Sequence, residues 1–333
     1  MPGISSPGGG FDSTTSLPFQ LRKANDTPAL SEISERDKPW DVHRAESDVI
    51  SGHYSGTEFN RYSQRIEDCS QFLDFRLTPD AVDGVYRLKL YAARFCRVRH
   101  CMVCSWRRSL MYKARAYRTL PHVVADYPAA RYLFLTLTVK NCPIHELRET
   151  LKWMNQSFNR LVKLKSWPGI GYLKTVEVTR GRDGRSAHPH FHVLLMVPGS
   201  YFGRKYLSQK RWCELWQKAL RVDYQPILDV QALKVGESPV GLLAEIIKYQ
   251  CKPSQLIHTD RQWFLELTRQ LHRTKAIAFG GIFKKYFRDF ERKATDEELI
   301  AGEGQDDDPG VDEGHLRFNW RRIEKLYRMI EST

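Results

Sequence analysis

The sequence predicts an α/β (α+β) protein in which a central, largely antiparallel sheet is flanked by helices and preceded by a small cysteine-rich segment. Three observations predict this fold. Strand-like and helix-like segments follow one another in the order strand, helix, hairpin, helix, strand, helix. The turn sequence "GRDG" at 181–184 separates two apolar strands, which indicates antiparallel pairing. Cysteines gather ahead of the first strand of this series.

By composition, the chain divides into four segments. Residues 1–55 are rich in Gly, Ser, Pro, Asp and Glu and lack apolar periodicity, so we expect them to be mostly disordered. Residues 56–125 hold short strand-like runs, the cysteines and a basic helix, and residues 126–292 hold the α/β domain. Residues 293–333 combine an acidic linker with a basic, amphipathic terminal helix, "RFNWRRIEKLYRMIEST".

Periodicity and flanking residues predict the individual elements. A basic helix begins near Ser105, whose hydroxyl can cap it. The Thr, Val and Leu content of residues 131–141 predicts a central strand, and the apolar stripe of residues 143–164 predicts a long amphipathic helix. Residues 171–180 and 188–197 form the hairpin. Helices are expected at 208–221, 239–253 and 260–274, and a strand at 227–234.

The charge of the chain indicates a polyanionic partner, and nucleic acid is the first expectation. The sequence has 52 Lys+Arg against 39 Asp+Glu, a net charge of +13. No segment reaches the roughly 20 apolar residues of a membrane span, and residues 1–16 do not resemble a secretory signal, so we expect a cytoplasmic protein. The basic helix is expected to contact DNA phosphates. Its candidate residues are Arg107, Arg108, Lys113, Arg115 and Arg118.

The cysteine spacing predicts a structural metal site. Cys101 and Cys104 form a C-x2-C pair, with Cys96 just before it and Cys69 further upstream. Four thiolates of this kind suit a closed Zn²⁺ site, although the gap between Cys69 and Cys96 is long and His100 is an alternative fourth ligand. The other reading is a set of unlinked, reduced thiols.

A histidine strand predicts a second metal site. In "HPHFH", His188, His190 and His192 alternate, so they lie on one face of the strand, successive rings about 7 Å apart. Reflecting His190 through the hairpin turn places Glu177 opposite it, on the same face. Glu177 and His188 therefore compete as the third ligand. Two imidazoles and one carboxylate leave coordination positions open, which suits an ion that must also contact its substrate. Hard oxygen ligands and a phosphate substrate favour Mg²⁺ or Mn²⁺, although the imidazoles would also accept other transition metals.

A third group lies on the helix predicted for residues 239–253. Glu245 and Tyr249 are four residues apart, and Lys252 is three beyond Tyr249, so all three share a helix face. A phenol has a pKa of about 10 and attacks poorly near neutral pH. A neighbouring ammonium and a metal-bound phosphate favour its attack, and a carboxylate can later activate water. The alternative is a core tyrosine beside a surface ion pair.

The segments "FLTLTVKN", "HPHFHVLLMV" and "EIIKYQCK" resemble, in order and character, the three motifs of the HUH endonuclease superfamily. The chain is most similar to the replication initiator (Rep) family of rolling-circle plasmids, of the single-tyrosine type, over about residues 69–286. A similar cysteine pattern precedes the first motif in that family, which favours the zinc reading.

The resemblance implies a role for each motif residue. His190 and His192 would hold the divalent ion, and Tyr249 would be the nucleophile that joins the 5′ side of the nicked DNA. The freed 3′-hydroxyl would prime synthesis, Glu245 would activate water at the end of the cycle, and Lys252 would neutralise phosphate charge. The implied partners are plasmid origin DNA, as a hairpin or single-stranded nick site, and a host helicase and polymerase.

Two alternatives remain open. A single-strand DNA transposase or a conjugative relaxase would use the same chemistry in another genetic role, although a relaxase usually carries its tyrosine before its histidines. From a different class, the chain would be a zinc-containing DNA-binding regulator without catalysis. Loss of nicking in Tyr249→Phe separates the enzymes from the regulator.

Overall fold

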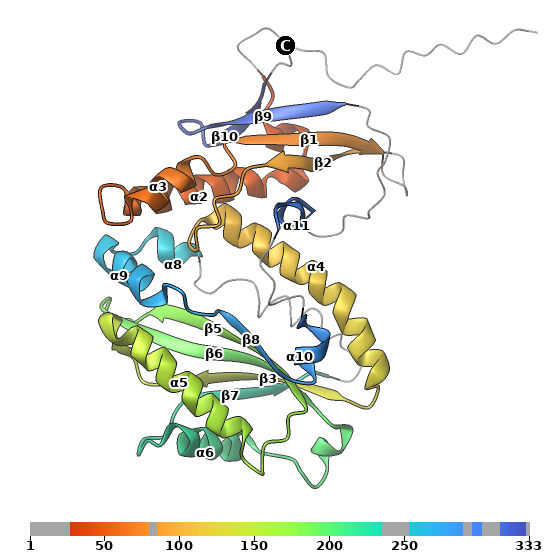
Figure 1. Cartoon of the computed structure of the whole chain (residues 1–333), viewed down its shortest axis with the longest axis vertical. Coiled ribbons are helices and arrows are strands. Elements are labelled where there is room, and N and C mark those ends of the chain that lie inside the picture. The colour runs from red at the N-terminus through yellow and green to blue at the C-terminus, as the bar shows by residue number, and fades with distance from the viewer. Residues whose placement is uncertain (1–26, 80–84, 235–252, 289–294, 302–313, 331–333) are drawn as a thin grey trace, which may run out of the picture.

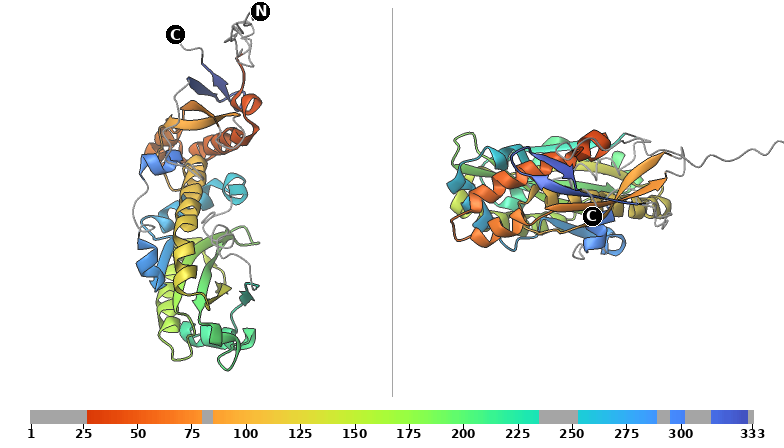
Figure 2. Two further views of the ribbon diagram at one scale, coloured as in Figure 1. Left: turned by 90° about the vertical axis from the view of Figure 1, so that its right-hand side faces the viewer. Right: turned by 90° about the horizontal axis from the view of Figure 1, so that it is seen from above.

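The computed structural model describes residues 27–79, 85–234, 253–288, 295–301 and 314–330. Two antiparallel sheets lie towards opposite ends of an elongated molecule, and helix α4 (Met102–Asp126) runs from one towards the other (Figure 1). Turning the molecule by 90° shows the same arrangement along its long axis (Figure 2). The predicted antiparallel α+β architecture with flanking helices is confirmed.

The larger sheet has the strand order β7-β3-β6-β5-β8, and the short β4 also pairs with β6. The predicted hairpin is its centre, where β5 (Gly171–Arg180) pairs antiparallel with β6 (Ser186–Val197). The predicted strand at 131–141 is β3 (Arg131–Thr138), on the other side of β6. The remaining strands are β4 (Cys142–Pro143), β7 (Leu228–Ala232) and β8 (Ile277–Gly281).

Helices cover the two faces of this sheet unequally. Helix α5 (Leu147–Val162) packs its apolar stripe on the face that carries Phe191 and Leu195, with α6 (Gln209–Leu220) beside it. On the opposite face, the second half of α4 packs against Leu194 and Met196, towards one end of the strands. The histidines lie on this second face, further along β6. Packing therefore fills one end of that face and leaves its polar residues at the other.

The smaller sheet has the order β10-β9-β1-β2, so the strands from the end of the chain lie against β1. Its strands are β1 (Phe72–Pro79), β2 (Tyr86–Ala93), β9 (His315–Arg321) and β10 (Leu326–Met329). The terminal helix expected from 317 onward is therefore wrong. Leu316, Phe318 and Trp320 alternate along β9, and this period of two fits a strand whose apolar side chains pack inward.

The prediction of disorder is also wrong for residues 27–55, of which most are helical. Helix α2 (Pro39–Tyr54) buries one stripe against the smaller sheet and the start of α4. Because polar side chains stand between the apolar ones in that stripe, the hydropathy of the sequence does not show the helical period. Arg44 is buried there and binds Asp48 at 2.7 Å, and Ser47 and Ser51 are buried as well.

Most other elements match their predicted positions. Helices α5, α6 and α9 (Arg261–Leu271) and strand β7 lie where they are expected, and α4 begins three residues before Ser105. The helix expected at 239–253 lies outside the described residues. The short helices are α1 (Leu30–Ile33), η1 (Glu35–Asp37), α3 (Asn60–Glu67), η2 (Ile144–Glu146), η3 (Gly199–Phe202), α8 (Pro253–Ile257), α10 (Phe283–Tyr286) and α11 (Asp296–Ala301).

Among the described residues, no helix combines the length and apolar character that crossing a membrane requires.

Candidate functional site

Three side chains converge on the face of the larger sheet that lies opposite α5. The Nε2 atoms of His190 and His192 lie 3.0 and 2.8 Å from the same carboxylate oxygen of Glu177. One ligand atom from each of the three residues lies within 4.8 Å of the others. Two imidazole nitrogens and one carboxylate oxygen are a donor set that suits a divalent ion with open coordination positions.

Strand register explains this convergence. Glu177 on β5 is directly opposite His190 on β6, and His192 follows two residues later on the same face. His188, the competing third ligand, lies on that face too, with its ring centroid 5.5 Å from that of His190. Its Nδ1 atom instead lies 2.8 Å from Oδ1 of Asn141. The structure therefore brings Glu177, rather than His188, to the histidine pair.

Neighbouring groups hold the two rings in orientation. Thr136 on β3 is directly opposite His192, and its hydroxyl lies 3.2 Å from Nδ1 of that ring. Phe134 stacks on the same ring with a centroid distance of 5.3 Å. Both contacts leave Nε2 of His192 directed at Glu177. Sequence reasoning missed Thr136, although its place in "FLTLT", one strand away from the histidines, is the signal that identifies it.

The electrostatics of the cluster favour a charged carboxylate. Burial acts to raise the pKa of Glu177, but the hydrogen bonds from His190 and His192 outweigh it and lower this pKa to about 2. Burial, together with the charge of His190, lowers the pKa of His188. A carboxylate ionised at neutral pH beside nitrogen donors is a cation-binding arrangement.

The remaining predicted catalytic residues, Glu245, Tyr249 and Lys252, lie outside the described residues. The segment that contains them follows strand β7, which pairs with β3 next to the histidine strand. Their convergence on the metal cluster stays a prediction.

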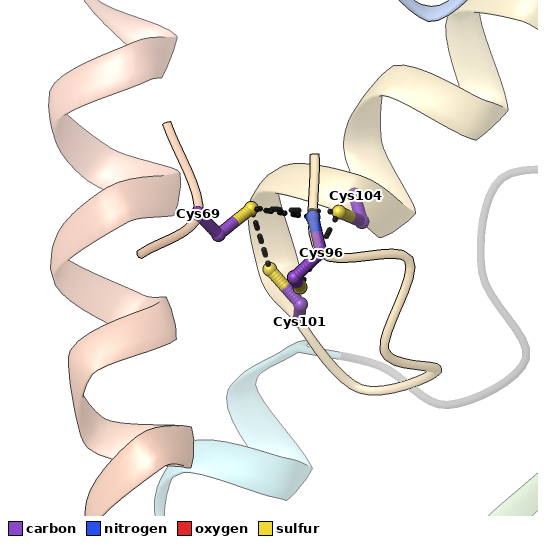
Figure 3. A group of neighbouring side chains, drawn as sticks. All are labelled: Cys69, Cys96, Cys101 and Cys104. Atoms are coloured by element: carbon purple, nitrogen blue, oxygen red, sulfur yellow. Dashed lines mark hydrogen bonds between the residues drawn. The ribbon is translucent and has the colours of Figure 1, made fainter. Parts of the chain in front are cut away.

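A second cluster forms where α3, β2 and α4 meet. The sulfur atoms of Cys69, Cys96, Cys101 and Cys104 point towards one another (Figure 3). The Sγ–Sγ distances are 3.6 Å for Cys69–Cys104, 3.7 Å for Cys96–Cys104 and 3.7 Å for Cys69–Cys101. These distances exceed a disulfide bond of about 2.05 Å. They match the separation of about 3.8 Å expected of thiolates placed tetrahedrally about one ion at 2.3 Å.

Backbone groups around the cysteines fit a metal-binding cluster. The N–H groups of Cys96, Arg97 and Val98 donate to cysteine sulfurs over 3.4, 3.2 and 3.4 Å. Such donors stabilise the negative charge of bound thiolates. His100, the alternative fourth ligand, is buried with its ring against Phe264 and outside the cluster, and burial lowers its pKa to about 3. The four thiols thus form a complete ligand set.

Helix α4 differs from the predicted phosphate-contacting surface at two positions. Arg107 is buried and donates to the backbone carbonyls of Leu299 and Ile300, both over 2.7 Å. Arg115 is buried as well and binds Glu298 over 2.6 Å. The expectation that these two arginines face DNA is wrong because they hold α11 against α4.

The other basic residues of α4 are more accessible. Arg118 is exposed, and Lys113 and Arg108 are partly exposed. The guanidinium of Arg108 donates to the carbonyl of Arg99 over 2.9 Å. Trp106 is partly buried against the core and packs edge-on against Trp40 at 4.9 Å. Arg108, Lys113 and Arg118 therefore remain the candidate phosphate contacts on this helix.

Comparison with known proteins matches residues 87–328 to a family described as Replication protein. Protein rep of Streptococcus pneumoniae serotype 2 is 38% identical over 228 residues, which cover 67% of this chain and 70% of that protein. Protein rep of Lactiplantibacillus plantarum is 32% identical over 298 residues, or 84% and 92% of the two chains. A Replication protein of Staphylococcus aureus is 31% identical over 226 residues, or 62% and 95%. No solved structure matches the chain.

Proposed function

The chain belongs to the Rep family of replication proteins, and from this membership we propose that it starts rolling-circle replication of a plasmid by nicking one DNA strand at the origin. The observation that supports the nicking chemistry is the convergence of Glu177, His190 and His192 on one face of the larger sheet. This cluster offers a divalent-ion site, as a metal-dependent phosphodiester reaction requires.

The residues of the cluster would hold Mg²⁺ or Mn²⁺, which supplies a Lewis acid that polarises the scissile phosphate. His190 and His192 would offer imidazole nitrogens to the ion, and Glu177 would offer the negative charge that balances part of the cation's charge. Thr136 keeps His192 in the orientation that presents Nε2. Their joint task is to position the phosphate in line with the attacking oxygen.

Tyr249 is the proposed nucleophile. Its phenolic oxygen gives up its proton and forms a bond to the phosphorus, the bond to the 3′-oxygen breaks, and that oxygen takes up a proton to become the free 3′-hydroxyl primer. Lys252 offsets phosphate charge next to the phenol. Glu245 later activates the water that hydrolyses the 5′-phosphotyrosine link.

The cysteine cluster is the proposed structural Zn²⁺ site, and the zinc would hold the small sheet to the start of α4. The proposed partners are origin DNA, in hairpin or single-stranded form, and a host helicase and polymerase that extend the nicked strand. Reduced cysteines are typical of the cytoplasm, where we place the reaction.

The test is incubation of the full chain with supercoiled plasmids that carry candidate origins, with Mn²⁺ or Mg²⁺, followed by mapping of the protein-linked 5′ end. We expect Tyr249→Phe to lose both the nick and the covalent adduct while DNA binding persists, and Tyr206→Phe, an exposed tyrosine elsewhere, to keep both. Glu245→Ala should make the first nick but release product poorly. An adduct that persists in Tyr249→Phe would contradict the proposal.

A further inference from the structure

A cavity of about 640 Å³ lies on the face of the larger sheet that α5 covers, which is the face away from the histidine cluster. Its floor is apolar and includes Leu151 of α5 and Val176 and Val178 of β5. Helix α9 meets the start of α5 there, and the segment from α9 to β8 forms the remaining wall (Figure 1). The volume lies within the range of about 300 to 1,000 Å³ that is usual for small-molecule sites.

Small side chains next to β5 leave this space open. Strand β8 is at the edge of the described sheet, and its Ala278 is directly opposite Lys174 of β5. Ala276, just before β8, lines the cavity as well. A methyl group is too short to fill the space between an edge strand and the helix that covers it. Gln156 and Asn159 at the rim are exposed, so the cavity opens to solvent.

Lys174 lines this cavity from the sheet and is only 5% exposed. Its ammonium nitrogen lies 4.0 Å from the ring centroid of Phe191 and 4.9 Å from that of Phe158, and it donates to the amide oxygen of Asn155. Among the described residues, no carboxylate offsets its charge, and burial lowers the pKa of this amine to about 7. Because buried ammonium groups are normally paired with an anion, the missing partner is the feature to be explained.

The other charged residues at the cavity do not supply that partner. They are Arg99, Arg148, Glu149, Lys152 and Lys275. The guanidinium groups of Arg99 and Arg148 donate to backbone carbonyls at the end of α9 and in the residues that follow it. Glu149 is the only carboxylate among the described lining residues, and it pairs with Lys152 over 3.3 Å with both side chains largely exposed. Lys275 is exposed and is a further cation.

We propose that this cavity binds a small molecule in which a phosphate or carboxylate group is joined to a flat aromatic ring, and that the anionic group pairs with the ammonium of Lys174. The ligand would supply the negative charge that a buried lysine requires. Its ring would lie on the apolar floor, and the amides of Gln156 and Asn159 would bond polar atoms at the edge of the ring. The site is distinct from the proposed metal site because Lys174 and Glu177 lie on opposite faces of β5.

Isothermal titration of the full chain in EDTA at pH 8 tests the proposal with four probes. AMP carries a phosphate on a ring-bearing molecule and salicylate carries a carboxylate on a ring, whereas adenosine lacks the anion and inorganic phosphate lacks the ring. We expect AMP or salicylate to bind, and adenosine and inorganic phosphate to bind at least about ten-fold more weakly, since a hydrogen bond to a charged group or the ring contact is lost. The preference between AMP and salicylate distinguishes a phosphate ligand from a carboxylate ligand.

Lys174→Met should weaken binding of the preferred probe by about ten-fold or more. The matched control is Lys163→Met, which replaces an exposed lysine directly after α5 and outside the cavity and should bind within about two-fold of wild type. Binding at pH 8 must also re-form the ammonium, so wild type should take up about one proton, measured from the dependence of the heat on the ionisation enthalpy of the buffer. Lys174→Met should lose this proton uptake.

Reductive methylation of wild type, followed by peptide mapping, needs no variant to fold. The preferred probe should slow modification of Lys174 and leave Lys163 unchanged. Failure of both AMP and salicylate to bind, equal affinity for adenosine, wild-type affinity in Lys174→Met or unprotected Lys174 would each overturn the proposal. The result is independent of the nickase, because His190→Ala/His192→Ala should lose nicking yet bind the probe as wild type does.

Discussion

Glu177 accepts from two imidazoles because antiparallel register places it opposite His190 and diagonal to His192. The same register places Thr179 opposite His188, whose ring turns to Asn141 instead. Whether Glu177 or His188 is the third ligand can therefore be tested by replacing each side chain in turn.

Replacing Glu177 with glutamine keeps its shape and removes its charge. We expect Mn²⁺ affinity to fall ten-fold or more, since a charged ligand is lost, and nicking to fall with it. Isothermal titration with Mn²⁺ on DNA-free protein measures the change. The matched control is His188→Gln, which should stay within a few-fold of wild type. The reverse order of the two variants would make His188 the third ligand.

Lys174 lies on the opposite face of β5 and is buried over the rings of Phe158 and Phe191, with its ammonium on the Asn155 side chain. Burial lowers its pKa from 10.5 to about 7. Between these values the unfolded chain binds a proton that the folded chain does not. The contribution of this group to stability therefore rises with pH across that window, by up to about 1.4 kcal/mol per pH unit.

Lys174→Met removes that proton linkage. The free energy of unfolding in urea should rise less between pH 7.5 and 9 for the variant than for wild type, by up to about 2 kcal/mol. Lys152→Met, which replaces an exposed lysine one helical turn before Asn155, serves as the control and should follow wild type. Parallel pH profiles for Lys174→Met and wild type would show that the buried amine stays protonated.

At the scale of elements, α4 carries buried, structural arginines and, at other positions, exposed basic residues that are the proposed phosphate contacts. Arg115→Met should destabilise the protein by about 3 kcal/mol, because it leaves Glu298 without its buried partner. Arg118→Met should leave stability unchanged and reduce the salt slope of DNA binding by about 0.7 to 0.9, for one phosphate. Thermal unfolding and salt titration measure the two effects. Equal stability of the two variants would contradict the assigned role of Arg115.

Elements whose turn residues and alternation lie within one short stretch of sequence could be predicted from that stretch alone. The turn "GRDG" and alternating histidines predicted the hairpin, its register and hence Glu177. Elements defined by distant partners were missed. Arg107 and Arg115 read as surface cations because α11, which covers them, comes more than 180 residues later. The stripe of α2 was hidden by Arg44, whose burial depends on Asp48 and on the carbonyl of Glu67.

At the scale of the whole molecule, the cysteine cluster joins α3, β2 and α4 at one point, and α4 extends from there to the larger sheet (Figure 1). Ser47 of α2 adds a further link, because its hydroxyl accepts from the N–H groups of Met102 and Val103 at the start of α4. Loss of the cluster should therefore loosen the connection between the two sheets.

Cys101→Ser should lower bound zinc, measured by elemental analysis, and cause cleavage by protease near the cysteines while the larger sheet stays folded. A chelator should have the same effect on wild type. Cys213→Ser, a buried thiol whose sulfur donates to the carbonyl of Pro226, is the control and should keep its zinc. Full zinc content in Cys101→Ser would rule out a four-cysteine site.

The smaller sheet closes only when both ends of the described chain meet. Strand β9 supplies the neighbour of β1, and the N–H of Met329 donates to the carbonyl of Pro28 over 3.1 Å. During synthesis β1 and β2 leave the ribosome early, yet β9, the other partner of β1, emerges some 240 residues after β1. The larger sheet is complete well before that point. Premature stop codons after residue 290 would thus yield polypeptides with the histidine cluster but with an unpaired edge on β1, which exposes such fragments to aggregation and proteolysis.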